Sequence, residues 1–157
     1  MEIKVKVLIT AAATAQAYQL ERILGEGVDT CFADSGELPG FMFKNKKFLT
    51  IQKGSAVSFA HELLTTCLDY EITHVFLLRR EEIIALSEAR TLFTEYGIEV
   101  VVPSAKIVKR LPFRTKPGSI GVKANGFHIG EVPLDADRGV FLSSPDDSGN
   151  FSIFSVS

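Results

Sequence analysis

Apolar residues occur along the first 104 residues in patterns typical of strands. Residues 3–9 alternate polar and apolar side chains and become fully apolar at residues 7–9, and residues 73–78 form a nearly continuous β-branched and apolar run. Such runs are typical of parallel strands that are buried on both faces. The same signal, in shorter form, predicts three more strands at residues 28–33, 46–52 and 98–102.

Between these strands, apolar residues recur three and four positions apart, as they do on one face of a helix. The first pattern starts at Ala13 and stops at Gly25, where a glycine tolerates the positive φ of a helix C-terminus. The second follows Ser55, a residue type that caps helix N-termini. The third runs as one helix from Glu81 to Tyr96, and its first acidic residues favour the positive end of the helix dipole.

Strands that alternate with helices form a parallel sheet with right-handed crossovers. The expected fold class is α/β, with a Rossmann-like five-stranded parallel sheet of order 3-2-1-4-5 and a C-terminal β-hairpin extension. The strand order reverses between the first and fourth strands, and such sheets bind ligands at the carboxyl ends of the strands around the reversal. The candidate ligand-binding residues in this crevice are Thr10, Thr14, Asp34, Arg79, Arg80 and Glu81.

Arg79 and Arg80 make a small anion the expected ligand of this crevice. They stand beside the predicted N-terminus of the third helix, where both the arginine charge and the helix dipole attract anions. The alternative is that these arginines pair with Glu81 or Glu82, or lie in solvent.

Residues 105–157 differ in kind from the domain formed by residues 1–104. Asn125-Gly126 suits a type I′ turn between strands at 119–124 and 127–132. A loop rich in turn-forming residues separates two further strands at 139–144 and 151–156. Isolated hairpins are only marginally stable, so these apolar strands must pack on the first domain or on a second copy of the chain. We expect self-association through the C-terminal hairpins as a homodimer.

Charge and cysteine content narrow the functional classes. A net charge of −2 and a pI near 5.9 argue against a nucleic-acid binder. The stretch from Lys106 to Lys116 holds five basic residues and no acidic one, and is expected to be a solvated connector. Cys31 and Cys67 lack metal-ligand spacing, so no metal is expected and both read as buried, reduced thiols. No signal peptide or membrane span is visible, and a cytoplasmic location is expected.

Residues 75–104, VFLLRREEIIALSEARTLFTEYGIEVVVPS, carry a family resemblance. Together with residues 44–72 and the region of Asp34-Ser35 and Leu38-Pro39, they resemble the pre-ATP-grasp (front) domain of carbamoyl-phosphate-synthase-like ATP-grasp proteins. The resemblance covers about two thirds of the chain. It implies a domain that stands in front of a catalytic ATP-grasp domain.

The chain departs from this family where ATP chemistry is concerned. Residues 10–14 read Thr-Ala-Ala-Ala-Thr rather than a glycine-rich turn, which prevents the close backbone approach of a pyrophosphate. The phosphate-binding lysines and a Glu-x-Asn magnesium set do not occur downstream. Residues 116–122, KPGSIGV, resemble a phosphate-loop strand of the family, but the predicted hairpins explain them without ATP.

The expected function is therefore a non-catalytic binding or assembly module, with no cofactor and no turnover of ATP. Two other classes stay open. In one, the chain completes a separately encoded ATP-grasp ligase in trans. In the other, it is a small nucleotide-binding enzyme.

Overall fold

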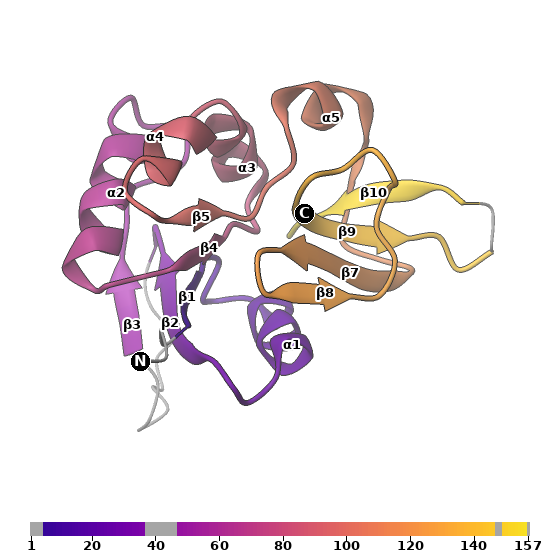
Figure 1. The fold of residues 1–157 in the computed structure, drawn as a ribbon, viewed down its shortest axis with the longest axis horizontal. Coiled ribbons are helices and arrows are strands. Elements are labelled where there is room, and N and C mark those ends of the chain that lie inside the picture. Colours follow the sequence, from indigo (N-terminus) through magenta and orange to yellow (C-terminus); the bar gives the residue numbers. More distant parts are fainter. Residues whose placement is uncertain (1–4, 37–46, 147–148, 157) are drawn as a thin grey trace.

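The computed structural model describes residues 5–36, 47–146 and 149–156. It contains two five-stranded sheets that lie side by side (Figure 1). The first sheet is parallel throughout, in the order β3-β2-β1-β4-β5, which confirms the predicted fold class and strand order. Its strands are β1 (Lys6–Ile9), β2 (Asp29–Asp34), β3 (Lys47–Thr50), β4 (His74–Phe76) and β5 (Glu99–Val100).

The helices that connect these strands are α1 (Ala15–Leu24), α2 (Phe59–Asp69), α3 (Arg80–Ser87) and α4 (Arg90–Thr94). The prediction of one helix from Glu81 to Tyr96 is wrong, because the chain breaks between α3 and α4. The Ser87 hydroxyl donates to the Ile84 carbonyl (2.7 Å), and such a bond competes with the helical pattern. Arg90 then donates to the Val102 carbonyl (3.1 Å), which fixes the start of α4 against the end of the sheet.

The C-terminal region forms a second sheet rather than two separate hairpins. Its elements are α5 (Ala105–Arg110), β6 (Phe113–Arg114), β7 (Ser119–Ala124), β8 (Phe127–Ile129), β9 (Gly139–Ser143) and β10 (Phe151–Phe154). Both predicted hairpins, β7–β8 and β9–β10, are present. Antiparallel pairing of β7 with β9 joins them, and β6 adds to β10 in parallel, giving the order β6-β10-β9-β7-β8.

The turn between β7 and β8 differs from the predicted type I′. Gly126 has a positive φ of 89°, but Asn125 does not, and a type I′ turn needs a positive φ at both central residues. The Asn125 backbone is held from outside the hairpin. Its N–H donates to the Glu99 carboxylate, and its carbonyl lies 2.7 Å from Nε2 of His74.

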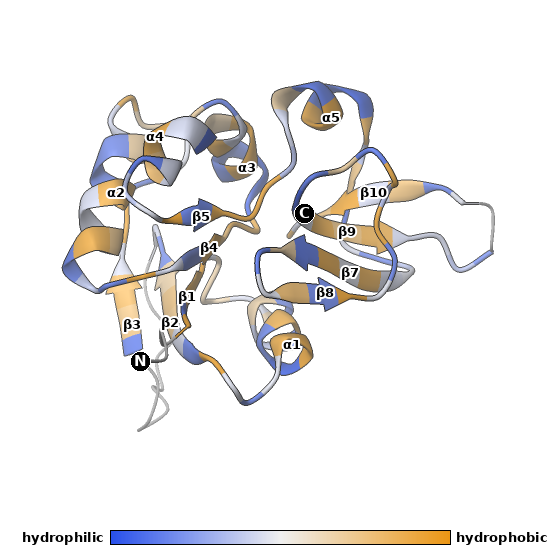
Figure 2. Cartoon of the chain, viewed as in Figure 1, coloured by the Kyte–Doolittle hydropathy of each residue, from blue (hydrophilic) through white to orange (hydrophobic). Residues whose placement is uncertain are grey.

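The second sheet packs on the first domain of the same chain. Apolar side chains of β1, β2 and β4 share a buried cluster with Val122, Phe127 and Val140 of the second sheet. Alternate residues of β9 and β10, such as Phe141 and Ile153, enter the other cluster, beneath the helices α2 to α5. Figure 2 shows apolar residues along β1, β9 and β10. These strands were expected to pack either on the first domain or on a second copy of the chain, and in this structure they pack on the first domain.

A polar seam also links the two sheets. The Arg90 guanidinium makes a two-bond contact with the Asp137 carboxylate, at 3.0 and 2.7 Å. Arg138 lies 3.7 Å from the Glu99 carboxylate, which also accepts from Asn125. Within the described residues, no helix combines the length and the apolar character needed to cross a lipid bilayer.

Candidate functional site

At the strand-order reversal, the structure brings together three of the predicted site residues, Thr10, Asp34 and Arg79. Asp34 ends β2 and is 1% exposed. The Arg79 guanidinium donates to both Asp34 oxygens, at 3.0 and 2.9 Å. The backbone N–H groups of Ala13 and Ser35 donate to the same carboxylate, at 3.1 and 2.8 Å. The buried Asp34 carboxylate therefore accepts four hydrogen bonds from its own chain, and the Arg79 side chain stays partly exposed.

The electrostatics of Asp34 reflect this pairing. Burial alone would raise the pKa of the Asp34 carboxyl, but the hydrogen bonds from Arg79, Ala13 and Ser35 outweigh it and hold that pKa below its ordinary value. In turn, the carboxylate raises the pKa of Arg79. The sequence alternatives for Arg79 were Glu81, Glu82 or solvent, and its partner is instead a residue 45 positions away.

The other predicted site residues do not converge on this pair. The Arg80 guanidinium lies over the Phe113 ring, 4.9 Å from its centroid, and so contacts the second sheet. Glu81 is exposed. Thr14 precedes α1, and its hydroxyl donates to the Ala11 carbonyl (2.7 Å), which closes the turn after β1.

Glu82 is a site residue that the sequence analysis did not select. Its side chain is fully buried at the start of α3, and Oε1 accepts from the Arg79 N–H (3.3 Å). Oε2 has no hydrogen-bond partner within the described residues. Burial raises the pKa of Glu82 to about 7, although Thr10 and Arg79 oppose the shift. The sequence could have indicated Glu82 by its position three residues after the helix N-cap Arg79, where a glutamate side chain commonly accepts from the N-cap N–H.

Backbone fills the space around this cluster. A Cβ added at Gly54 would lie 2.5 Å from the Glu82 nitrogen, so the loop before α2 touches the first turn of α3. Beyond the end of β10, Val156 forms a parallel bridge with Arg79, and its N–H donates to the Leu78 carbonyl (2.8 Å). The Thr10 hydroxyl accepts from the Leu78 N–H (2.9 Å). Backbone of the loop at Gly54 and of Val156 therefore lies against this cluster.

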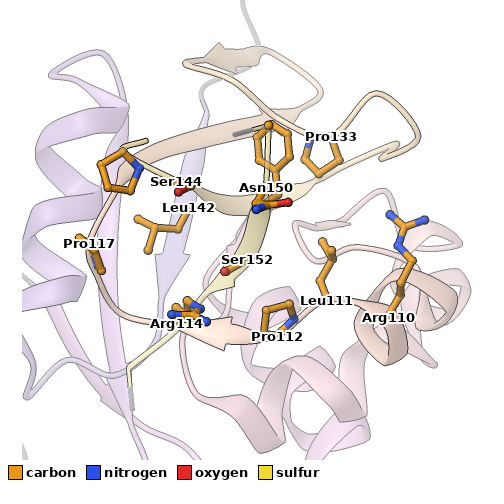
Figure 3. Close-up of a pocket in the computed structure, with 13 residues that line it drawn as sticks. Arg110, Leu111, Pro112, Arg114, Pro117, Pro133, Leu142, Ser144, Asn150 and Ser152 are labelled. Atoms are coloured by element: carbon orange, nitrogen blue, oxygen red, sulfur yellow. The ribbon is translucent and has the colours of Figure 1, made fainter. Parts of the chain in front are cut away.

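A larger hollow lies in the second sheet. It has a volume of about 530 Å³ and is lined by residues that include Arg110, Leu111, Arg114, Leu142, Asn150 and Phe151, which define what we call the basic groove. Four prolines also line it. Figure 3 shows Arg110 and Arg114 on one side, on the segment from α5 into β6, and Ser144 and Asn150 on the other.

The basic stretch recognised in the sequence supplies one wall of this groove. Its five basic residues are exposed, as expected for solvated side chains, but the segment also forms α5 and β6. Arg110 pairs with Asp135, 2.7 Å away, and both side chains are about half exposed. No carboxylate of the described residues forms an ion pair with Arg114. Arg114 therefore offers a charge that is open to a ligand.

The second hollow, the possible metal ligands and the cysteines give weaker support for a functional site than the basic groove. A second hollow of about 230 Å³ lies between the end of β3 and α2, where Glu62 is the charged residue in its wall. Within the part of the chain that the structure describes, no group of three His, Cys, Asp or Glu side chains is arranged to hold a metal. Both cysteines are free and buried, and burial raises the pKa of Cys67 to about 12, which keeps that thiol protonated.

Comparisons with known proteins do not suggest a function, so the proposal below rests on the geometry of the structure. No protein-family model matches this sequence, and no curated protein matches it. The similarity to pre-ATP-grasp domains accordingly stays a prediction from the residues quoted above.

Proposed function

We propose that the protein is a binding module that holds an anionic ligand in the basic groove. The observation that carries the proposal is the coincidence of two features. One wall of the hollow of about 530 Å³ is formed by Arg110, Leu111, Pro112 and Arg114, from a segment that contains no acidic residue between Lys106 and Lys116. Within that wall, Arg114 forms no ion pair with a described carboxylate.

The chemistry of the groove suits such a ligand. Ligand pockets commonly have volumes of about 300–1,000 Å³. A guanidinium offers planar, paired donors to carboxylate or phosphate groups. Leu111, Leu142 and Phe151 add apolar surface beside the charges, and the prolines restrict the backbone of the walls. The groove therefore combines charge, a few polar groups and apolar contact around one space.

The predicted anion site at the strand-order reversal is the rival location. Arg79 is already bonded to Asp34, and the uncompensated carboxyl of Glu82 lies beside it, so the charge there disfavours an anion. Arg80 is the remaining exposed cation of that site. Calorimetry on Arg80→Ala and Arg114→Ala separates the two locations.

The resemblance to pre-ATP-grasp domains supports a binding or assembly role, and residues 105–157 contain no Glu-x-Asn set. We therefore propose that the chain alone does not turn over ATP. We also propose that it works in the cytoplasm. Phosphate release from Mg-ATP on addition of a separate ATP-grasp chain would support the role in trans instead. Homodimer formation stays a prediction for light scattering, although the apolar residues that motivated it pack within the chain.

Calorimetry tests the proposed function on the full chain. The ligands are inorganic phosphate, pyrophosphate, citrate and an oligoglutamate peptide. At least one should bind, and Arg114→Ala should weaken that binding at least tenfold, whereas Arg22→Ala on α1 should leave it unchanged. Loss of binding in Arg80→Ala but not in Arg114→Ala would place the site at the strand-order reversal. If none of the ligands binds, the proposal is wrong.

A further inference from the structure

One edge of β10 is partly unpaired where it borders the basic groove. β6 pairs with β10 in the register Ile153↔Phe113 and Phe154↔Arg114. The N–H of Ile153 donates to the Pro112 carbonyl (2.8 Å), and that of Ser155 to the Arg114 carbonyl (3.1 Å). Alternate residues of a strand direct their backbone groups to the same edge. The N–H and C=O of Phe151 therefore point to this edge as well.

The sequence explains why β6 does not continue alongside Phe151. Arg110 is the last residue of α5, and the Leu111 N–H still donates to the Ile107 carbonyl (2.9 Å), so the chain there is turning out of a helix. Pro112 has no N–H to offer the Phe151 carbonyl. Among the described residues, no hydrogen bond joins the Phe151 backbone to α5 or β6. One donor and one acceptor of a sheet edge thus face the groove.

The opposite edge of β10 is occupied. Ser152 pairs with Leu142 of β9, and the Ser144 N–H donates to the Asn150 carbonyl (3.0 Å). An added strand therefore has one place to pair with this hairpin, between Phe151 and the walls formed by Leu111 and Pro112.

We propose that the ligand of the basic groove is an extended peptide segment of a partner protein, with acidic side chains, that pairs through its main chain with Phe151. The proposal rests on the proposed function and names its ligand class. Extended peptides commonly add to exposed sheet edges, where main-chain bonds give affinity and neighbouring pockets give specificity. The groove offers a backbone donor and a backbone acceptor together, and a peptide matches both.

Charge selects an acidic peptide over a neutral or basic one. Arg114, which forms no ion pair with a described carboxylate, lies beside the unpaired edge, and Arg110, paired with Asp135, lines the same wall. Carboxylates of an extended peptide alternate between its two faces, so those at every second position approach the arginines together. A small inorganic anion would satisfy the arginines but would leave the Phe151 carbonyl without a donor. This difference favours a peptide as the natural ligand.

Selection from a random heptapeptide display library against the full chain tests the ligand class without a guess at its sequence. Enriched peptides should be acidic, should bind Arg114→Ala at least tenfold more weakly, and should bind Arg22→Ala as they bind the wild type. In the best peptide, N-methylation of one central amide should also weaken binding at least tenfold. Enrichment of basic or neutral peptides, or tolerance of N-methylation at every position, would overturn the proposal.

A matched pair of protein variants tests the contact at Phe151. Phe151→Pro removes the N–H that faces the groove, at a strand edge where proline is tolerated. Phe151→Ala removes the same ring and keeps the N–H. After thermal melts show both variants folded, peptide binding should be at least fivefold weaker in the proline variant than in the alanine variant. Equal binding by the two would overturn the backbone pairing.

Three further results complete the test. If Phe151→Pro does not fold, the N-methylated peptides decide the question alone. If small anions bind in an Arg114-dependent manner and no peptide is enriched, the peptide inference fails while the proposed function stands. If neither anions nor peptides bind, both fail.

Discussion

The strand-order reversal of the first sheet and the basic groove of the second both present arginines, but their surroundings differ. At the reversal, Arg79 is bonded to a buried aspartate, and the backbone at Gly54 lies close to the start of α3. In the groove, Arg114 is exposed beside a hollow of about 530 Å³. The pairing of Asp34 serves the fold, because removing its cation leaves a buried charge without compensation. An exposed and unpaired arginine adds little to stability and is available to a ligand.

The sharpest test of this comparison removes each arginine in turn. Arg79→Ala leaves the Asp34 carboxylate buried without its cation, so we expect a loss on the order of 3–5 kcal/mol in the free energy of unfolding. Arg114→Ala should change that free energy by no more than about 0.5 kcal/mol. Urea denaturation at pH 7 measures both. Similar losses for the two variants would mean that the groove arginine is structural too.

Glu82 gives the next largest effect, and it depends on pH. Its pKa is raised from 4.5 to about 7 in the folded protein. An acid with a raised folded pKa costs no stability below its unfolded pKa, and its cost grows as pH rises from about 4.5 to 7 and is then constant. Glu82→Gln should therefore match the wild type near pH 4 and exceed it at pH 8, by on the order of 2–3 kcal/mol.

The control for this prediction is the oppositely shifted Asp34. Its pKa lies below the ordinary value, so its stabilising effect is present at neutral pH and is lost on acidification. That loss falls below the ordinary pKa of 3.8, so a change in the stability difference between the wild type and Glu82→Gln, measured by denaturation at pH 4, 6 and 8, reports Glu82 and not Asp34. A constant difference between Glu82→Gln and the wild type across this range would show that the Glu82 carboxyl keeps the same charge throughout.

Local patterns in the sequence were sufficient for the elements whose identity depends on neighbouring residues. Apolar runs predicted the five strands, and the alternation of strands and helices predicted their order. The hairpin at Asn125-Gly126 followed from its turn residues. The type of that turn did not, because Glu99 and His74 hold the Asn125 backbone from a different part of the chain.

Features that depend on distant residues were not predictable in this way. The pairing of Ile120 with Leu142, which merges the hairpins into one sheet, joins residues with no distinguishing local signal. The partner of Arg79 lies on another strand, and helix-dipole reasoning about Glu82 said nothing about its burial. The groove combines residues of 110–117 with Pro133 and with residues of 142–145 and 149–152, so its basic wall was visible in the sequence and its opposite wall was not.

Gly54 offers a smaller test of how tightly the reversal is filled. A Cβ there would approach the Glu82 nitrogen to 2.5 Å, and the obstacle is backbone that cannot swing aside. Gly54→Ala should therefore cost about 1–3 kcal/mol of unfolding free energy. Gly27→Ala is the matched control, because an added Cβ meets nothing within 4 Å there. Thermal melts compare the two, and equal melting temperatures would show that the loop before α2 has room to move.

The smallest expected effect comes from an ion pair with the same two-bond geometry as Arg79–Asp34 but in a more exposed place. Arg90 contacts Asp137 at 3.0 and 2.7 Å, yet the Asp137 side chain is 49% exposed, whereas that of Asp34 is 2% exposed. Water solvates the exposed carboxylate in the unfolded and folded states alike, and Arg90 also keeps its bond to the Val102 carbonyl when Asp137 is removed.

Asp137→Ala should therefore cost about 0.2–1 kcal/mol, and the cost should shrink as salt screens the pair. The measurement is urea denaturation at 50 mM and 500 mM NaCl. Asp34→Ala is the matched comparison, and its cost should be several times larger and less dependent on salt, because it also leaves the backbone N–H groups of Ala13 and Ser35 without their acceptor. If the two alanine variants lose the same stability, burial is not what separates these ion pairs, and the contrast between the reversal and the surface charges of the second sheet fails with it.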